Sequence, residues 1–464
     1  MDLQKNEAIQ RKKIQLLFLM AAGAVLLPFV LIDGLVPGMG YFLAEKYLAV
    51  PCLLFAGSAL SHRLSSSAKR CLLLSVIAVL WFAAVQMHHH LVHMDTSYFG
   101  IFAIGYLLAF PYATVTEEGD ENTGLKWIGK IYVAFSALMI VFGGMLLLDA
   151  IPEVLRGCLT WDGVRVVLLW HPNGTGCLFM LAIGFGLYFF TRSEKKTEKW
   201  ALAILMVLQF GVLSLTNSRT AILLTCAMVG GTVFFSFWKG GWKRFLAGMA
   251  AALVVMAVLF CAYSVLFDLH TEAQLNKLMR QEQMQNSDVV SDDRNAQKLH
   301  VDEETGEVSV SGQSGQGDLL SDMKNLNSRT TIWNAALTAV KDNPSIQIWG
   351  TQYVSAEIFS RAGFWVGHAH NSWIQILMLL GIPGFLAAVA YTLVAVWNVW
   401  ILIWRPQENI GKKVVAMMVI CMLAAGFLEV YLFVGDMNVS FVNFLFFLCT
   451  GYLVQWNRKA SETE

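Results

Sequence analysis

The chain has 464 residues, of which 56% are hydrophobic and 14% charged, and its formal net charge at pH 7 is +0. This composition is typical of a polytopic membrane protein rather than of a soluble domain. Because there is no basic surplus and Lys and Arg are not gathered on one face, nucleic acid is not an expected partner.

Apolar runs long enough to cross a bilayer, roughly 17–25 residues each, recur along the chain. They predict an all-α polytopic membrane protein with about 12 transmembrane helices, and a large extracytoplasmic loop lies between spans 9 and 10. The predicted spans cover residues 15–32, 40–60, 71–91, 97–115, 131–149, 174–190, 200–216, 220–238, 245–266, 384–404, 413–434 and 439–456.

The positive charges between these spans are distributed unevenly. The short connections of one set contain only Arg156, Arg165 and Arg219, whereas the connections of the other set and both termini are rich in Lys and Arg. Cytoplasmic loops carry the excess of positive charge. We therefore expect both termini to be cytoplasmic and the long loop to be extracytoplasmic.

Composition divides the chain into four parts. Residues 1–266 contain spans 1–9, and residues 267–326 form an acidic insert that we expect to be flexible, since it is polar and nearly free of aromatic residues. Residues 327–383 form an ordered cap, in which Thr331–Val340 has helical apolar spacing. Residues 384–464 contain spans 10–12 and a cytoplasmic tail.

A histidine pair closes the long loop and leads directly into apolar sequence. The segment reads His368-Ala369-His370-Asn371, and Gly381-Ile382-Pro383-Gly384 follows shortly after it. A histidine at the edge of a span can titrate near neutral pH while it stays hydrated. It therefore suits proton transfer on a substrate that arrives at the membrane surface.

Arginines on the same outer side form a second candidate feature. Asn-Ser-Arg-Thr occurs twice, with Arg219 in a tight hairpin and Arg329 at the start of the cap, and Arg165 precedes His171-Pro172-Asn173. Guanidinium stays ionised and binds phosphate oxygens in a bidentate manner, so together these residues could hold a phosphate. For any one arginine, a snorkelling anchor at the bilayer edge is an equal alternative.

Charged residues within spans leave two interpretations open. Lys46 either completes the anion site or pairs with Glu45 or with Glu429, predicted at a similar depth in span 11, to fix helix packing. The run His88-His89-His90 with His93 lacks carboxylates or cysteines at matching spacing, so we interpret it as an interfacial histidine run. No metal site is predicted.

In their order along the chain, these elements resemble the membrane glycosyltransferases of the O-antigen ligase and O-antigen polymerase superfamily of bacterial envelopes. The resemblance covers most of the chain. It is carried by the span count, the late external loop, the Arg165 to Asn173 segment, the Arg219 hairpin, Arg329 with Ile332-Trp333, and the His370-Asn371 to Gly381-Ile382-Pro383-Gly384 signature.

The resemblance implies a transferase of the bacterial inner membrane whose active site is extracytoplasmic. The donor would be a glycan linked to undecaprenyl diphosphate, the acceptor a carbohydrate or glycolipid hydroxyl, and neither metal nor cofactor would be needed. The family's general base carries over to His370, beside Asn371. Arg219 and Arg329 carry over as diphosphate contacts, to which Arg165, Asn371 and Lys46 are added as candidate substrate-binding residues.

Other functions remain open at this stage. We expect ligase-like transfer, with a repeat-unit polymerase of the same superfamily as the alternative. A flippase or transporter for lipid-linked glycans would also use spans, arginines and cavity carboxylates, but it would need no histidine base and would more often contain internal repeats. A non-catalytic assembly protein of the envelope is a third possibility.

The charge asymmetry predicts that residues 267–369 face outward. In a cysteine-free background, a membrane-impermeant maleimide should label His300→Cys in intact cells, and it should label Thr197→Cys only after permeabilisation. The opposite labelling pattern would reject this topology and move the histidine pair to the cytoplasmic side.

Overall fold

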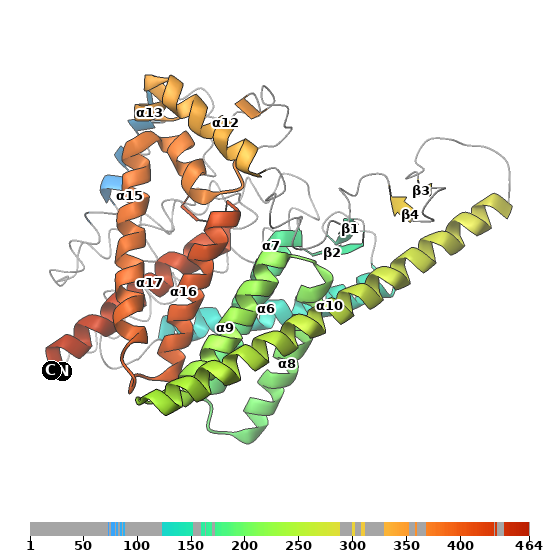
Figure 1. The fold of residues 1–464 in the computed structure, drawn as a ribbon, viewed down its shortest axis with the longest axis horizontal. Coiled ribbons are helices and arrows are strands. Elements are labelled where there is room, and N and C mark those ends of the chain that lie inside the picture. The colour runs from blue at the N-terminus through green and yellow to red at the C-terminus, as the bar shows by residue number, and fades with distance from the viewer. Residues whose placement is uncertain are drawn as a thin grey trace, which may run out of the picture.

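The computed structural model describes residues 123–151, 159–168 except 163, 172–287, 329–351, 368–430 and 440–463. It also describes the shorter pieces 299–301, 308–310, 358–359 and 432–433 and scattered residues between 73 and 88. Predicted spans 15–32, 40–60 and 97–115, and most of 71–91, lie outside these residues. Figure 1 shows that the described part is mostly helical.

Each of the eight other predicted spans corresponds to a helix. Seven of the described helices, all except the last of the series, are long and apolar enough to cross a membrane. The prediction of a mostly helical, polytopic membrane protein is thus confirmed, whereas the count of about 12 spans stays a prediction. The eight helices are α6 (Thr123–Leu147), α7 (Pro172–Arg192), α8 (Lys196–Leu215), α9 (Arg219–Phe237), α10 (Trp242–Ser287), α15 (Ser372–Ile403), α16 (Ile410–Leu428) and α17 (Ser440–Thr463).

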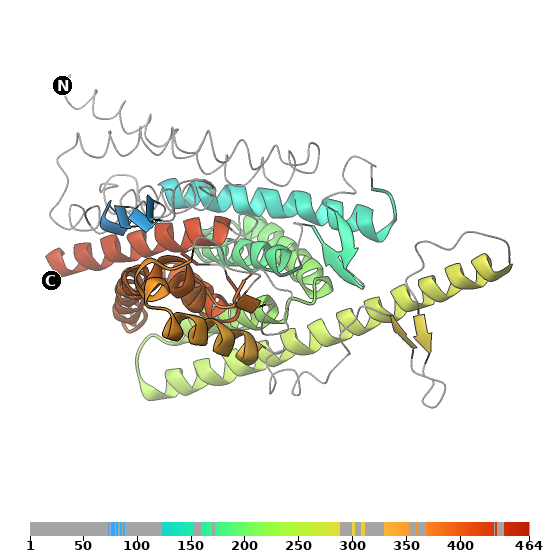
Figure 2. The ribbon, with the colours of Figure 1, turned by 90° about the horizontal axis from the view of Figure 1, so that it is seen from above.

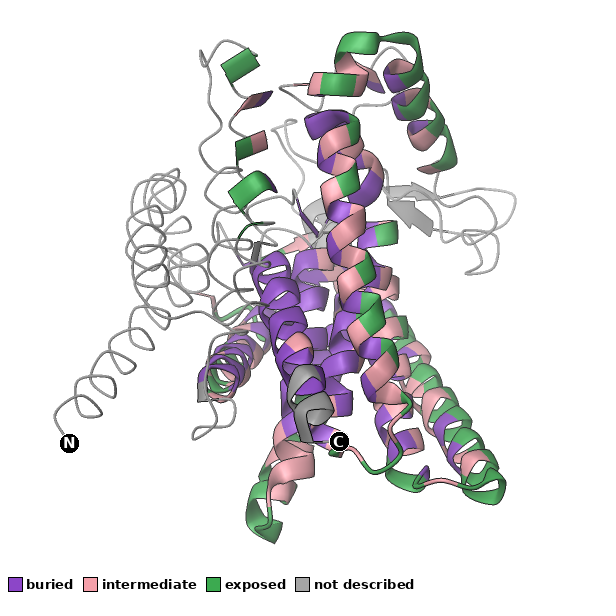
Figure 3. Ribbon diagram, turned by 90° about the vertical axis from the view of Figure 1, so that its left-hand side faces the viewer, coloured by how far each residue is buried: buried purple, intermediate pink, exposed green. Residues whose placement is uncertain are grey.

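Helix α7 lies at the centre of the bundle. Most of its residues are buried, and it packs against α6, α8, α9 and α16 (Figure 3). Glycines allow this close approach: a Cβ added at Gly184 would lie 2.8 Å from Met418 Cγ of α16, and one at Gly176 would lie 2.5 Å from Ser218 Cβ. Such small residues are typical of helix interfaces in membranes.

Helix α10 is longer than the sequence predicted. It continues to Ser287, whereas the predicted span ends at 266, and it runs past the rest of the bundle (Figure 2). After 266 the chain contains helix-forming residues such as Leu, Glu, Gln and Lys and no Gly or Pro, so nothing ends the helix. Contacts also hold it: Lys277 forms an ion pair with Asp149, and the His270 ring lies 2.9 Å from the Val164 carbonyl.

Two small antiparallel hairpins depart from the all-α prediction. β1 (Thr160–Asp162) pairs with β2 (Arg165–Val167), and β3 (Leu299–Val301) pairs with β4 (Val308–Val310). The first hairpin packs against α7, where the Leu168 amide donates to Thr175 Oγ1 at 3.1 Å. Its sequence contains β-branched residues and an Asp-Gly pair at the connection, which favours a hairpin.

The cap consists of α12 (Arg329–Asp342) and α13 (Pro344–Trp349), which lie over one end of α15 (Figure 1). Helix α12 confirms the helical spacing predicted for Thr331–Val340. Its apolar face packs on the first part of α15 in a cluster separate from the main core. The buried members of this cluster are Ile332, Ala336, Val340, Phe359, Ala369 and Met378.

Helix α15 begins at Ser372, before the predicted span start at 384, and is interrupted at Gly381, where φ is 66° and ψ is −170°. A short helical segment, 372–380, therefore precedes the main apolar helix. The interruption has a covalent cause, since Gly381 tolerates positive φ and Pro383 lacks the N–H that a continuous helix would use.

Candidate functional site

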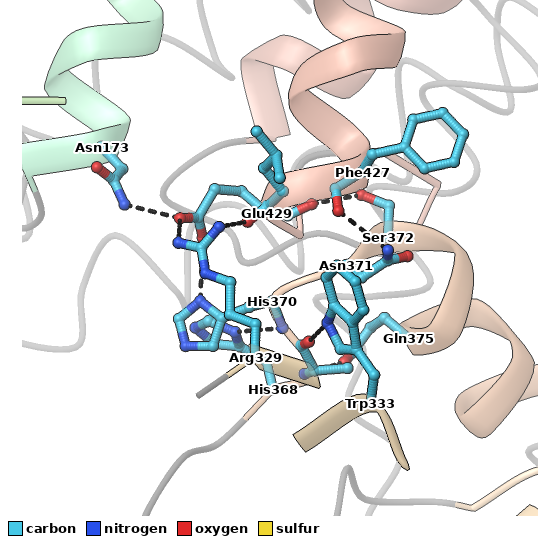
Figure 4. A network of polar contacts seen from close by, with 12 residues as sticks. Asn173, Arg329, Trp333, His368, His370, Asn371, Ser372, Gln375, Phe427 and Glu429 are labelled. Carbon is cyan, nitrogen blue, oxygen red and sulfur yellow. Dashed lines mark hydrogen bonds and ion pairs between the residues drawn. The ribbon is translucent and has the colours of Figure 1, made fainter. Parts of the chain in front are cut away.

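A buried carboxylate joins four separate parts of the chain. The Glu429 side chain is 6% exposed, and its Oε1 accepts hydrogen bonds from Arg329 Nη2 at 2.7 Å and from Asn173 Nδ2 at 2.9 Å. Its Oε2 lies 3.2 Å from Nδ1 of His370 (Figure 4). The candidate base, one candidate arginine and the first turn of α7 therefore meet at one acidic group.

The position of Glu429 corrects the sequence analysis. We expected it within a span at 413–434, but α16 ends at Leu428 and Glu429 has an extended backbone, with φ −147° and ψ 167°. Ser372 fixes this loop, since its Oγ donates to the Glu429 carbonyl at 2.9 Å and accepts from the Leu432 amide at 3.0 Å. Past this end of the helix, the carboxylate meets donors that lie outside α16.

The surroundings of Glu429 favour its ionised form. Burial raises the pKa of this carboxyl, but the hydrogen bond with His370 and the positive charge of Arg329 lower it by more, so its pKa lies below the ordinary value. Ionised Glu429 can only accept hydrogen bonds. In its contact with His370, the proton must therefore be on Nδ1.

His370 is held in an unusual backbone conformation. Its φ of 48° lies in the left-handed region, which few residues other than glycine adopt. Its amide donates to Nδ1 of His368 at 3.3 Å, and the two rings are 4.1 Å apart between centroids. With Nδ1 directed at Glu429, Nε2 is the nitrogen that can take a proton, and the side chain is 24% exposed.

Neighbouring contacts fix the chain on both sides of His370. Trp333 of α12 donates from Nε1 to the Ala369 carbonyl at 2.9 Å, and the Ala369 amide donates to Gln375 Oε1 at 2.9 Å. Asn371 is the N-cap of α15: its Oδ1 accepts from the amides of Trp373 and Ile374 at 2.9 and 3.1 Å. The histidine is thus presented from a rigid helix start.

The side chain of Asn371 is occupied in holding the fold. Besides capping α15, its Nδ2 donates to the Phe427 carbonyl in the last turn of α16 at 3.0 Å, and the residue is 6% exposed. These contacts connect α15 to α16 next to Glu429. A direct contact of Asn371 with substrate stays a prediction.

Arg329 begins α12 and is directed at the end of α16. Besides Glu429, it donates from Nη1 to the Leu428 carbonyl at 2.5 Å, so these two contacts use two of the five N–H donors of the guanidinium. The side chain is 17% exposed. Its contact with a diphosphate stays a prediction, for which the remaining donors are the relevant atoms.

The other predicted arginines lie on neighbouring elements. Arg219 is the first residue of α9 and follows Ser218, which packs closely on Gly176 of α7. Asn173 lies one turn before Gly176 on α7, so Arg219 and the Glu429 network occupy the same end of adjacent helices. Arg165 is in β2, which also packs on α7.

Two predicted features fall on parts of the chain that the structure does not describe. Lys46 and Glu45 both lie outside the described residues, so neither interpretation of Lys46 is tested. Of the histidine run, only His88 is described, and its ring stacks on Trp349 with centroids 4.4 Å apart.

The sequence analysis named Glu429 only as an alternative partner of Lys46 in helix packing, and Asn173 only as part of a segment that could hold a phosphate. It did not predict that the two side chains meet. The sequence feature that could have indicated a site is the position of Glu429 near the outer end of an apolar run. A charge in such a position usually faces a partner or a cavity. The identity of that partner could not be read from positions so distant in sequence.

We predict that Glu429→Gln destabilises the fold, because it leaves the Arg329 guanidinium without its counter-ion. Removing one member of a buried pair costs about 3 kcal/mol, which should appear as a lower unfolding temperature in detergent. Since its pKa is lowered on folding, Glu429 stabilises the native protein above the unfolded-state pKa of a glutamic acid. This contribution is lost as the pH falls through the lower folded-state pKa, so wild type and variant should converge in acid.

The control is Glu198→Gln, which breaks the exposed Lys195–Glu198 pair. It should leave the unfolding temperature unchanged. Equal unfolding temperatures for wild type and Glu429→Gln at neutral pH would contradict the interpretation of Glu429 as the stabilising centre of this network.

Comparison with known proteins addresses the family. No curated protein matches the chain. Residues 202–389 match the family model described as O-antigen ligase, a stretch that extends from α8 through the cap to the first half of α15 and includes Arg219, Arg329 and His370. This match supports the O-antigen ligase and polymerase superfamily that the sequence resemblance implied.

Proposed function

We propose that this protein transfers a glycan from an undecaprenyl-diphosphate carrier to a carbohydrate hydroxyl at the outer face of the bacterial inner membrane, in the manner of an O-antigen ligase. The family match supports an activity of the ligase or polymerase type. The observation that carries the mechanism is the contact of His370 Nδ1 with Glu429 at 3.2 Å.

This contact suits a general base. The carboxylate fixes the tautomer in which Nε2 has the free lone pair, and it stabilises the imidazolium that forms when Nε2 takes a proton. Arg329 and Asn173 hold Glu429 in turn. The two donors orient the carboxylate, and the carboxylate orients the histidine. This arrangement suits a base that must lie within hydrogen-bond reach of an acceptor hydroxyl.

In the proposed reaction, the acceptor oxygen attacks the anomeric carbon as its proton passes to Nε2 of His370. The bond between the anomeric carbon and the diphosphate oxygen breaks, and its electron pair leaves with the lipid diphosphate. Negative charge grows on this leaving group, which guanidinium groups can stabilise. Arg219 and Arg329 are the residues that we assign to this task, with Arg165 and Lys46 as further contacts.

The polymerase alternative shares the same chemistry and differs in the acceptor, which would be another lipid-linked repeat unit. Deletion of the gene separates the two activities. Loss of a ligase should leave full-length chains on undecaprenyl diphosphate, whereas loss of a polymerase should leave single repeat units.

We predict that His370→Ala inserts normally and still binds the lipid-diphosphate donor, but loses about 10²- to 10⁴-fold in turnover, which is the range typical of a positioned general base. Turnover by the wild type in reconstituted vesicles should rise with pH over the range in which the base loses its proton. His368→Ala is the matched variant and should have a milder effect.

A different pH profile would point to another role. If His370 bound phosphate as a cation, activity would fall over the same range. A near-wild-type rate for His370→Ala from about pH 6 to 9 would remove the base assignment and favour a flippase or transporter instead.

We predict that Arg219→Lys impairs transfer although the charge is kept, because an ammonium cannot bind two phosphate oxygens as a fork does. Losing one charge-assisted hydrogen bond of roughly 1.5–3 kcal/mol corresponds to about a 10- to 150-fold decrease. Arg192→Lys, at the opposite end of α7, is the control. Full activity of Arg219→Lys with a defined donor would make Arg219 a membrane anchor.

A further inference from the structure

The interruption of α15 is occupied by a second segment of chain. Gly350, which ends α13 with φ 71°, faces the backbone of Leu379, and a Cβ added there would lie 2.3 Å from the Leu379 carbonyl oxygen. Gly381, at the interruption, faces the backbone of α13 in the same way, and its added Cβ would lie 2.3 Å from the Ile348 carbonyl oxygen.

Two segments thus cross backbone to backbone, with a glycine on each side of the crossing. Ordinary van der Waals contact begins at 3.4 Å, so a methyl group at either glycine would push the segments apart by about 1 Å. Both residues also have positive φ, which a side chain disfavours. Only glycine satisfies both conditions at Gly350 and Gly381.

The carbonyl groups next to the interruption receive donors from outside α15. The Met378 carbonyl accepts from the Thr351 amide at 2.6 Å and from Thr351 Oγ1 at 3.1 Å. The Leu380 carbonyl accepts from Trp81 Nε1 at 3.0 Å. A break in a membrane helix is tolerated where such partners satisfy the freed backbone groups.

Aromatic stacking adds a third part of the chain to this crossing. The ring of Trp349, the last residue of α13, stacks on Trp81 with centroids 5.4 Å apart and on His88 with centroids 4.4 Å apart. The crossing therefore ties α13, the interrupted α15 and residues of predicted span 71–91 together.

We propose that Gly350 and Gly381 are positioning residues of the transfer reaction: their crossing fixes the segment 372–380, and with it His370, against the cap that contains Arg329. This inference rests on the proposed function. Segment 372–380 begins directly after His370 and Asn371 and is followed by Gly381. It therefore connects the crossing to the site through one short piece of helix.

The cap transmits the same constraint to Arg329. Helix α13 follows α12 after Asn343, and the buried cluster of Ile332, Ala336 and Met378 packs α12 on the same segment. A separation at the crossing would therefore shift Arg329, which the cap contains, relative to His370 and Glu429, since Asn371 and Ser372 connect the start of α15 to the end of α16. Misplacement of a reacting group by about 1 Å can cost 10²-fold in rate.

The test measures turnover per folded molecule for Gly350→Ala and Gly381→Ala in vesicles with a defined undecaprenyl-diphosphate glycan. We expect a fall of about 10- to 100-fold. Spin labels at Leu337→Cys on α12 and Leu393→Cys on α15, both exposed positions, report the geometry independently of activity. Their distance distribution should shift or broaden in both glycine variants.

Gly240→Ala is the matched control, because Gly240 also has positive φ, at 96°, but nothing lies within 4 Å of an added Cβ. It should leave turnover and label distances unchanged. This control separates backbone strain, which all three variants share, from the close crossing, which only Gly350 and Gly381 form.

If the glycine variants fail to accumulate, Thr351→Val and Trp81→Phe test whether the crossing positions the site. Each removes one side-chain donor to α15; Thr351→Val keeps the shape of the side chain, whereas Trp81→Phe also reduces the ring that stacks on Trp349. Each should lower turnover per folded molecule on the order of 2- to 10-fold. A purely structural crossing would instead lower the amount of folded protein and leave the turnover of each folded molecule intact.

Full turnover per folded molecule in Gly350→Ala and Gly381→Ala, or in both substitutes when these do not fold, overturns the inference. Failure of the proposed function looks different. In that case His370→Ala would keep its activity, while the label distances in the glycine variants would still report whether the crossing sets the position of the cap.

Discussion

The ion pair and hydrogen bonds of Glu429 are the constraint on which the site depends. Taking a carboxylate out of water costs several kcal/mol unless cations and donors replace the lost hydration. Here the donors come from Arg329, Asn173 and His370, which lie 100, 256 and 59 residues away in sequence. The chain satisfies this one charge only when the cap, α7 and the start of α15 converge on the end of α16.

A second constraint comes from the membrane itself. Backbone groups at a break in a spanning helix need partners, because the hydrocarbon region supplies none. The interruption at Gly381 meets this need with Thr351 and Trp81. Segment 372–380 therefore has fixed ends, with the Asn371 cap at one and the glycine crossing at the other, which gives His370 a rigid support.

These two constraints also separate the tasks of the polar groups. Arg329 and Glu429 form an ion pair in which Glu429 also contacts His370 and Arg329 keeps donors that the pair does not use. Arg219 lies at the start of α9, where the helix dipole adds to its positive charge. The proposed base beside this ion pair, with Arg219 on an adjacent helix, fits the proposed reaction, in which a proton leaves the acceptor and negative charge grows on the leaving group.

The sequence by itself determined the class of the protein and the eight later helices, and it named His370 as the candidate base, since apolar run length and local motifs depend only on neighbouring residues. It did not predict the helical segment 372–380 or the break at Gly381, although Gly381 and Pro383 are local causes of that break. Local pattern failed where distant contacts matter: Asp149 and Val164 bind polar turns of α10 beyond the predicted span, in a stretch that also lacks Gly and Pro, and Glu429 lies past the end of α16, where it meets Arg329. Only the tertiary structure could pair Gly350 with Gly381 or Glu429 with His370, because a convergence of segments far apart in sequence leaves no period or motif in any one of them.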